Sequence, residues 1–165
     1  MLKSISNFDN FQYETEVPVR ITDINYGNHL GNDSFVSMLH EARVRFLGSI
    51  GYSELKFGKV SVIMVDLYIK YKQQVFYPDT LRVKIGISNL KKCSFDIIYK
   101  ITSKKTGKEA AAAKMSMASF DYDARRPVKL PRLCRNQTGY RPHLTAAIHN
   151  QFLVDDTFLN QIKYS

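Results

Sequence analysis

A short polar loop holds the side chains best suited to acid–base or nucleophilic chemistry. The segment 22–32 contains Asp23, Asn25 and His29, and it is too rich in Asn and Gly to form a regular element. A carboxylate or an imidazole can take up a proton or attack a carbonyl carbon, and an amide can orient water. We therefore treat these side chains as candidate catalytic residues. Each also has a structural alternative, because such residues often only form a turn or fix a loop.

The helix predicted after this loop begins where a substrate oxygen could bind. The first backbone amides of a helix have no partner within the helix, and the helix dipole adds positive potential at the same point. We expect these amides to stabilise a carbonyl oxygen that becomes anionic, and a glycine there lets a substrate approach the backbone closely. The residues predicted to contact substrate are Gly31, Asn32, Asp33 and Ser34, and one of the last three is also expected to cap the helix.

Two further carboxylates lie outside the loop. Glu41 is on the predicted helix, about 12 Å from its start at roughly 1.5 Å per residue, so within one chain it is poorly placed for chemistry there. It is expected to tie the helix to the sheet, with a second carboxylate of the site as the alternative. Asp66 is expected to be solvated or ion-paired in a strand, or else to face a partner subunit and contribute to a shared substrate site. Asp23 and His29 are expected to carry more of the activity than Asn25 or Glu41.

Hydrophobic spacing predicts one strand, one long helix and then four more strands. Apolar residues recur at helical spacing from Phe35 to Ile50. Alternation within 60–72 predicts that Ile63, Val65, Leu67, Ile69 and Tyr71 share one face of a strand. In all, strands are indicated over 13–21, 60–72, 81–87, 93–101 and 109–117. The last of these is ambiguous, because Glu-Ala-Ala-Ala-Ala-Lys strongly favours a helix. Its place after a hairpin turn makes a strand our interpretation.

This order predicts an α+β fold in which a five-stranded antiparallel sheet wraps around one long central helix. Such an arrangement buries the helix and one face of the sheet together. The predicted domain covers residues 1–131. Residues 132–165 have weaker patterning and are interpreted as an unassigned C-terminal extension, whose apolar residues are compatible with a short helix or two.

Composition narrows the classes of partner. The formal net charge of +9 favours anionic partners. Because the basic residues are dispersed, a phosphorylated cofactor or an acidic carrier protein is favoured over specific nucleic-acid binding, with a merely solvated basic surface as the alternative. The sequence shows no membrane-spanning stretch, no signal peptide, and no metal or disulfide pattern at its two cysteines. A cytoplasmic location is therefore expected.

The loop and the order of elements resemble the hotdog-fold acyl-CoA thioesterases, specifically the group around 4-hydroxybenzoyl-CoA thioesterase and the plant acyl-carrier-protein thioesterases. The resemblance covers about residues 12–131 and rests on Val19-Arg20, Asp23, Asn25, Gly27, His29-Leu30-Gly31-Asn32, Glu41-Ala42-Arg43, Tyr71, Asp79 and Pro127-Val128 with Leu130-Pro131. It implies hydrolysis of an acyl thioester of coenzyme A or acyl carrier protein, without a metal or cofactor. It also implies a homodimer or homotetramer with sites built across subunits.

The loop departs from this family in one respect. Relatives often carry Asp-x-Asp there, and the second Asp does the chemistry. Counting from Arg20, or back from His29, places Asn25 at that position, whereas matching on Thr22-Asp23 places Asp23 there. If Asn25 occupies it, either another group serves or the protein binds acyl groups without cleaving them. A hotdog dehydratase acting on hydroxyacyl thioesters through His29 and Asp23 is a third hypothesis.

Overall fold

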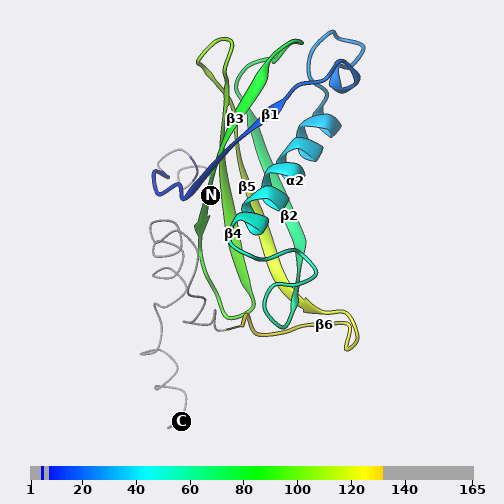
Figure 1. Ribbon diagram of the computed structural model, residues 1–165, viewed down its shortest axis with the longest axis vertical. Coiled ribbons are helices and arrows are strands. Elements are labelled where there is room, and N and C mark those ends of the chain that lie inside the picture. Colours follow the sequence, from blue (N-terminus) through cyan, green and yellow to red (C-terminus); the bar gives the residue numbers. More distant parts are fainter. Residues whose placement is uncertain (1–4, 6–7, 132–165) are drawn as a thin grey trace.

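The computed structural model describes Ile5 and residues 8–131 of the chain. One long helix, α2 (Asn32–Ser49), lies along one face of an antiparallel sheet (Figure 1). The strands are β1 (Tyr13–Pro18), β2 (Ser61–Tyr71), β3 (Thr80–Ser88), β4 (Ser94–Ser103), β5 (Glu109–Asp121) and the short β6 (Arg126–Pro127). Their order is β1-β3-β4-β5-β2, with β6 beside β5. The predicted α+β fold, five principal strands around one helix, is confirmed.

The core lies between α2 and the sheet. Apolar residues at helical spacing give α2 one buried face, which packs against alternate residues of β3, β4 and β5. Burying one such side chain contributes roughly 1.5–3 kcal/mol, so this face, rather than local propensity, holds the helix in place. The face is formed by Phe35, Met38, Leu39, Ala42, Arg43, Phe46 and Leu47.

The segment predicted with opposing signals, Glu109–Met117, is part of strand β5. It pairs with β4 on one side and with β2 on the other. The interpretation as a strand is therefore confirmed. Hydrogen bonding on both edges satisfies the backbone that a helix would otherwise satisfy internally, so tertiary context overrides the helix propensity of the alanines.

The end of β1 and the start of α2 differ from the predictions. β1 ends at Pro18, and Ile21 begins the short 3-10 helix η1 (Ile21–Asp23) instead of continuing the strand. The N-cap of α2 is Gly31, and no side chain in the described part of the chain caps it. The predicted capping by Asn32, Asp33 or Ser34 is wrong, because these three residues form the first helical turn.

A β-bulge at Val65 changes which residues of β2 face the helix. The ladder with β5 skips Val65. Before the bulge, Val62 is buried in the core, and after it Leu67 packs against the same core. The predicted single apolar face that includes Ile63 and Val65 is therefore wrong, and Val65 is 62% exposed.

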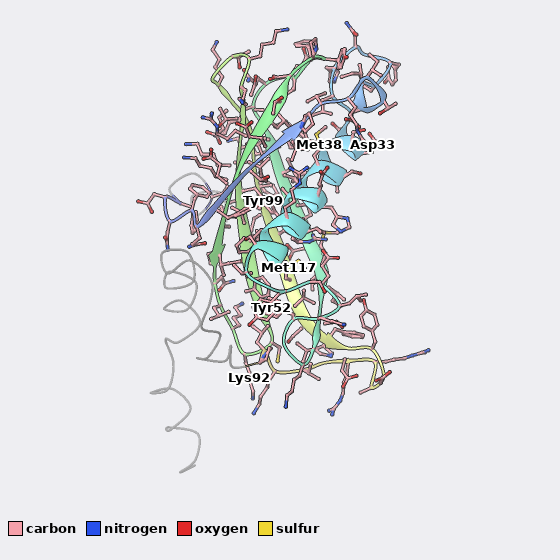
Figure 2. All side chains as sticks on the ribbon, viewed as in Figure 1. Asp33, Met38, Tyr52, Lys92, Tyr99 and Met117 are labelled. Atoms are coloured by element: carbon pink, nitrogen blue, oxygen red, sulfur yellow. The ribbon has the colours of Figure 1, made fainter. Side chains whose placement is uncertain are left out.

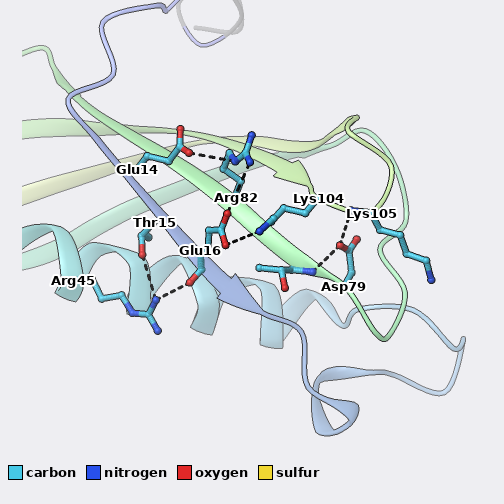
Figure 3. Close-up of polar contacts among 9 residues, drawn as sticks. Glu14, Thr15, Glu16, Arg45, Asp79, Arg82, Lys104 and Lys105 are labelled. Atoms are coloured by element: carbon cyan, nitrogen blue, oxygen red, sulfur yellow. Dashed lines mark hydrogen bonds and ion pairs between the residues drawn. The ribbon is translucent and has the colours of Figure 1, made fainter.

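The two edges of the sheet differ in chemistry. On β1, Glu14 pairs with Arg82 of β3 (3.3 Å), and Glu16 pairs with Lys104 (2.8 Å) (Figure 3). Such charges, together with a proline, protect an edge from pairing with another chain. The β2 edge is longer, at 11 residues against six, and its exposed large apolar side chains are Met64, Val65, Tyr68 and Tyr71. Within the described residues, no helix is long and apolar enough to cross a membrane.

Candidate active site

The polar loop between η1 and α2 is a tight reversal. Ile24 and Leu30 form an isolated bridge, and the Asn25 amide donates to the carbonyl of His29 (2.9 Å). Asn28 has a positive φ of 60°, which asparagine tolerates better than most residues. The Gly31 amide donates to the carbonyl of Asp23 (2.9 Å) and fixes the loop to the start of α2. Backbone hydrogen bonds thus join the loop to the helix start.

Asn25 and His29 are bonded to each other and to Gly27. Oδ1 of Asn25 accepts from the Gly27 amide (2.8 Å), and Nδ2 lies 3.3 Å from Nε2 of His29. Nδ1 of His29 lies 3.1 Å from the Gly27 carbonyl. An amide nitrogen only donates and a carbonyl only accepts, so these contacts are satisfied by a neutral imidazole protonated on Nδ1. Both ring nitrogens of His29 are engaged inside the loop.

Asp23 is held by Arg20. One carboxylate oxygen accepts from the Arg20 amide (2.8 Å) and from Nε (3.2 Å), and the other accepts from the guanidinium (2.9 Å). The side-chain hydrogen bond from Arg20 lowers the pKa of Asp23 below its ordinary value, although burial of the carboxyl opposes the shift. The Asp23 side chain is only 4% exposed. Its carboxylate is therefore a weakened base that closes η1.

The start of α2 offers free backbone donors next to this loop. The Phe35 amide donates to the Gly31 carbonyl and closes the first turn (2.9 Å), which leaves the earlier amides without a helical acceptor. Gly31 leaves room at this point, because a Cβ there would lie 2.6 Å from Oδ1 of Asp33 and would displace that side chain, whereas its 3.5 Å distance to the Asp23 carbonyl is an ordinary contact. Figure 2 shows Asp33 at this end of α2. The structure thus brings the loop candidates together with the predicted substrate-binding turn.

Glu41 lies away from that turn. It pairs with Arg45 one helical turn later, and its side chain is about half exposed. Arg45 in turn donates to the carbonyl of Glu16 on β1 (2.7 Å) (Figure 3). The salt bridge expected for Glu41 is therefore present, and it ties the helix to β1 through Arg45.

Asp66 lies on the sheet face that turns away from α2. Its carboxylate accepts from the buried Lys114 (3.2 Å), which also donates to Ser116 (2.7 Å) and lies 3.8 Å from Asp96. Burial opposes ionisation of Asp66, but hydrogen bonds from Ser116 and Lys114 outweigh it, and the pKa of Asp66 falls below its ordinary value. Asp66 is an ion-paired strand residue that the fold does not bring to the loop.

A second polar cluster lies beside the middle of α2, and the sequence analysis missed it. Arg43 is buried, and its Nε donates to Oε1 of Glu54 (2.6 Å) in the loop before β2. Its guanidinium also contacts the sulfur of Met115, which accepts from the hydroxyl of Tyr99 (3.6 Å). Burial raises the pKa of Tyr99 although the charge of Arg43 opposes the shift. Figure 2 shows Tyr99 in the middle of the molecule.

His40 completes this cluster at the surface. Its Nε2 lies 3.5 Å from Oε2 of Glu54, the oxygen that Arg43 Nε does not bind, and its side chain is 55% exposed. His40 and Arg43 are three residues apart, so they share one side of the helix. That spacing was a usable signal. Glu54 comes from a different segment, and no sequence pattern joins it to the helix.

An antiparallel sheet around one long helix, with a glycine and a polar loop at the helix start, defines a hotdog-fold protein. The family model for the thioesterase-like superfamily matches residues 19–148. The chain belongs to this superfamily, and its membership supports the predicted class of enzyme, a thioester hydrolase.

Individual proteins support the same assignment. A protein of Aquifex aeolicus, provisionally named an esterase, is 30% identical over 91 residues, which are 54% of this chain and 70% of that protein. The DHNA-CoA thioesterase from Staphylococcus aureus aligns with a TM-score of 0.68 at 20% identity over 92% of this chain and 95% of that one. A 1,4-dihydroxy-2-naphthoyl-CoA thioesterase from Synechocystis gives 0.66 at 21% identity over 72% of this chain and 89% of that one. At these identities the two structures show likeness of fold.

Proposed function

We propose that the chain hydrolyses an acyl thioester of coenzyme A or of an acyl carrier protein in the cytosol, and releases a carboxylic acid and a free thiol. The observation that carries this proposal is the uncapped first turn of α2 beside Gly31. Its amides can bind the thioester carbonyl oxygen and stabilise the negative charge that develops when water attacks the carbonyl carbon. The names of the Staphylococcus and Synechocystis proteins, both coenzyme A thioesterases, support that choice of carrier.

The roles of the loop side chains are part of the proposal. Proton transfer by Asp23 and His29 stays a prediction. Their contacts favour a supporting role, in which Asp23 closes η1 and His29 fixes the loop through Gly27 and Asn25. For His29 to accept a proton at Nε2, it would first have to give up its contact with Asn25.

We also propose that the protein is a homo-oligomer, at least a dimer, joined edge to edge through β2. The β1 edge carries charges and Pro18, whereas the β2 edge offers an open ladder flanked by apolar side chains. Val65→Lys should therefore release monomers of 19.0 kDa in sedimentation at micromolar concentration, whereas Asn10→Lys, which adds the same charge at an exposed position before β1, should not. A wild-type monomer at that concentration would contradict the proposal.

A non-catalytic acyl binder is the second candidate function. The observation that favours it is that Asn25 supplies no carboxylate, while Asp23 and His29 are engaged by neighbours within the loop. Such a protein would bind acyl-CoA saturably without releasing thiol.

One panel of thioesters separates these functions. Aromatic and aliphatic acyl-CoA and acyl carrier protein substrates are offered while free thiol and unsaturated thioester are followed. Thiol release supports the hydrolase, unsaturated thioester identifies a dehydratase, and binding without product identifies the binder.

A pair of variants at Asn32 tests the amide donors directly. Asn32→Pro deletes one backbone N–H at the first helical position, where proline fits, and the extended conformation of Gly31 (φ −67°, ψ 149°) suits a residue before proline. Loss of one such donor typically lowers kcat by about 100- to 1,000-fold. Asn32→Ala keeps the amide and should retain activity. Equal activity of the two variants would show that this amide does not bind the substrate oxygen.

A further inference from the structure

We propose that His40, oriented by Glu54, transfers the protons of hydrolysis at the helix start of a second copy of this chain. The inference rests on the proposed hydrolase function and edge-to-edge dimer. It supplies the base that the loop does not offer, since Asp23 is held by Arg20 and both ring nitrogens of His29 are engaged.

His40 has the surroundings of an acid–base group. Nε2 faces Glu54 at 3.5 Å, whereas within the described residues no hydrogen bond is made to Nδ1. The Glu54 carboxylate is fixed from its other oxygen by the buried Arg43, so it can orient the imidazole and stabilise the cation formed when Nδ1 takes up a proton. Glu54 is a positioning residue here, because it acts through His40.

The helix start of the same chain is out of reach. His40 is eight residues beyond Asn32, which places it about 12 Å along the helix at roughly 1.5 Å per residue. A proton acceptor must lie within hydrogen-bond reach of the attacking water, or one water away. His40 therefore has to serve a helix start that comes from another subunit.

The β2 edge brings such a helix start to His40. At the end of β2, Tyr71 packs edge-on against Phe35 in the first turn of α2, with ring centroids 5.3 Å apart. At the beginning of β2, the Val62 amide donates to the carbonyl of Glu54 (2.7 Å). Antiparallel pairing of two copies about the middle of β2 places the beginning of one strand beside the end of the other. The Glu54–His40 pair of one copy then faces the first helical turn of its partner.

The shape of the molecule agrees with a dimer in which opposite ends of the two copies lie side by side. The loop before α2 and the turn after α2 lie at opposite ends of the sheet (Figure 1), and Asp33 and Lys92 mark these ends in Figure 2. A two-fold axis across β2 reverses the ends, so each loop lies next to the partner's α2–β2 connection. A dimer would hold two such composite sites.

The chemical step balances without a metal or cofactor. Water attacks the carbonyl carbon, and one of its protons passes to Nδ1 of His40 while the carbonyl oxygen becomes anionic at the helix start. When the carbonyl re-forms, the carbon–sulfur bond breaks and Nδ1 returns the proton to the leaving sulfur. The products are a free thiol and a carboxylic acid.

A tagged heterodimer tests the assignment. One chain carries His40→Ala and the other carries Asn32→Pro, and dimers with both tags are isolated. Each homodimeric variant should lose about 100-fold or more in kcat. The heterodimer should recover about half of the wild-type rate, because it contains one site made of an intact helix start and an intact His40. Val44→Ala, on the same exposed side of α2, should leave the rate unchanged.

The other outcomes overturn the inference separately from the function. An inactive heterodimer alongside an active wild type would show that His40 acts within its own chain. An active His40→Ala homodimer of normal mass would show that His40 has no part in turnover. A wild type that releases no thiol from any substrate would instead remove the proposed hydrolase function. Melting temperature and sedimentation of each variant exclude loss of folding or assembly as the cause.

Discussion

Nδ2 of Asn25 lies 3.3 Å from Nε2 of His29, and Oδ1 of the same amide accepts from the Gly27 backbone (2.8 Å). This amide shapes the loop, and it occupies one of the two positions, Asn25 or Asp23, at which the resemblance leads us to expect a carboxylate. A carboxylate could keep the contact to Gly27, but it could not donate to His29. The loop is thus built around an amide, and one substitution introduces a carboxylate at this position.

We expect Asn25→Asp to raise kcat by about tenfold, because it places a proton acceptor beside the uncapped helix start. The measurement is thiol release under saturating substrate. Asn25→Ala, which removes both contacts, should lower the melting temperature without this gain. An unchanged or reduced kcat for a well-folded Asn25→Asp protein would show that position 25 does not face the reacting carbon.

The sequence predicted the elements and the position of the loop because both leave a local signature. Hydrophobic periodicity marks α2, and Asn and Gly mark the loop. The bulge at Val65 has no such signature, since it arises from the pairing of β2 with β5. For the same reason, alternation wrongly placed Ile63 and Val65 on the same face of β2 as Leu67.

The sequence predicted the partners of polar side chains less well than it predicted the helix and strands. That Asp23 would be held by Arg20, three residues earlier, depends on a 3-10 turn that replaced the end of a predicted strand. The His40–Glu54–Arg43 cluster depends on how a loop returns beneath the helix. Side-chain type gave the list of candidates, and only the fold decides which of them remain available for chemistry.

The hydrogen bonds from Arg20 to Asp23 make the free energy of unfolding depend on pH in the acid range. The pKa of Asp23 is lowered in the folded state, so the contribution to stability is present above the unfolded pKa of about 3.9 and is lost as pH falls through the lower folded value. Asp23→Asn should therefore lower the melting temperature at pH 7, and its difference from wild type should shrink below about pH 4. A pH-independent difference would contradict this linkage.

The same variant separates two roles for Asp23 in catalysis. If Asp23 only holds the loop, activity and melting temperature should fall together. A loss in kcat of about 100-fold with an unchanged melting temperature would instead support direct proton transfer.

The Arg43–Glu54 pair should respond unequally to the loss of either partner. The Arg43 side chain is 7% exposed and that of Glu54 is 28% exposed. Glu54→Ala leaves a buried guanidinium unpaired and should cost about 3–5 kcal/mol in the free energy of unfolding. Arg43→Met keeps the core filled and leaves a carboxylate that reaches water, so its cost should be smaller. Urea denaturation measures both, and equal losses would contradict the asymmetry.

Some basic side chains on the surface are ion-paired, and one group that is not lies together at an end of the sheet. On the β1–β3 side, Glu14 and Glu16 pair with Arg82, Lys84 and Lys104. At the other end of the sheet, the turns after β3, α2 and β5 carry basic side chains that form no ion pair within the described residues. Figure 2 shows Lys92 there. This basic end consists of Lys56, Lys59, Lys91, Lys92, Arg125, Arg126 and Lys129.

In the proposed dimer, the basic end lies beside the partner's loop, where an anionic coenzyme A or carrier protein would approach. Raising ionic strength from about 0.1 M to 1 M shortens the screening length from about 10 Å to 3 Å and weakens such steering. KM should therefore rise with salt more than kcat falls. Replacing Lys91 and Lys92 together by Gln should raise KM and flatten its salt dependence, whereas the matched replacement of Lys84 and Lys104, whose charges are already paired, should change KM little. A KM for an anionic thioester that stays constant with salt would show that this charge does not capture substrate.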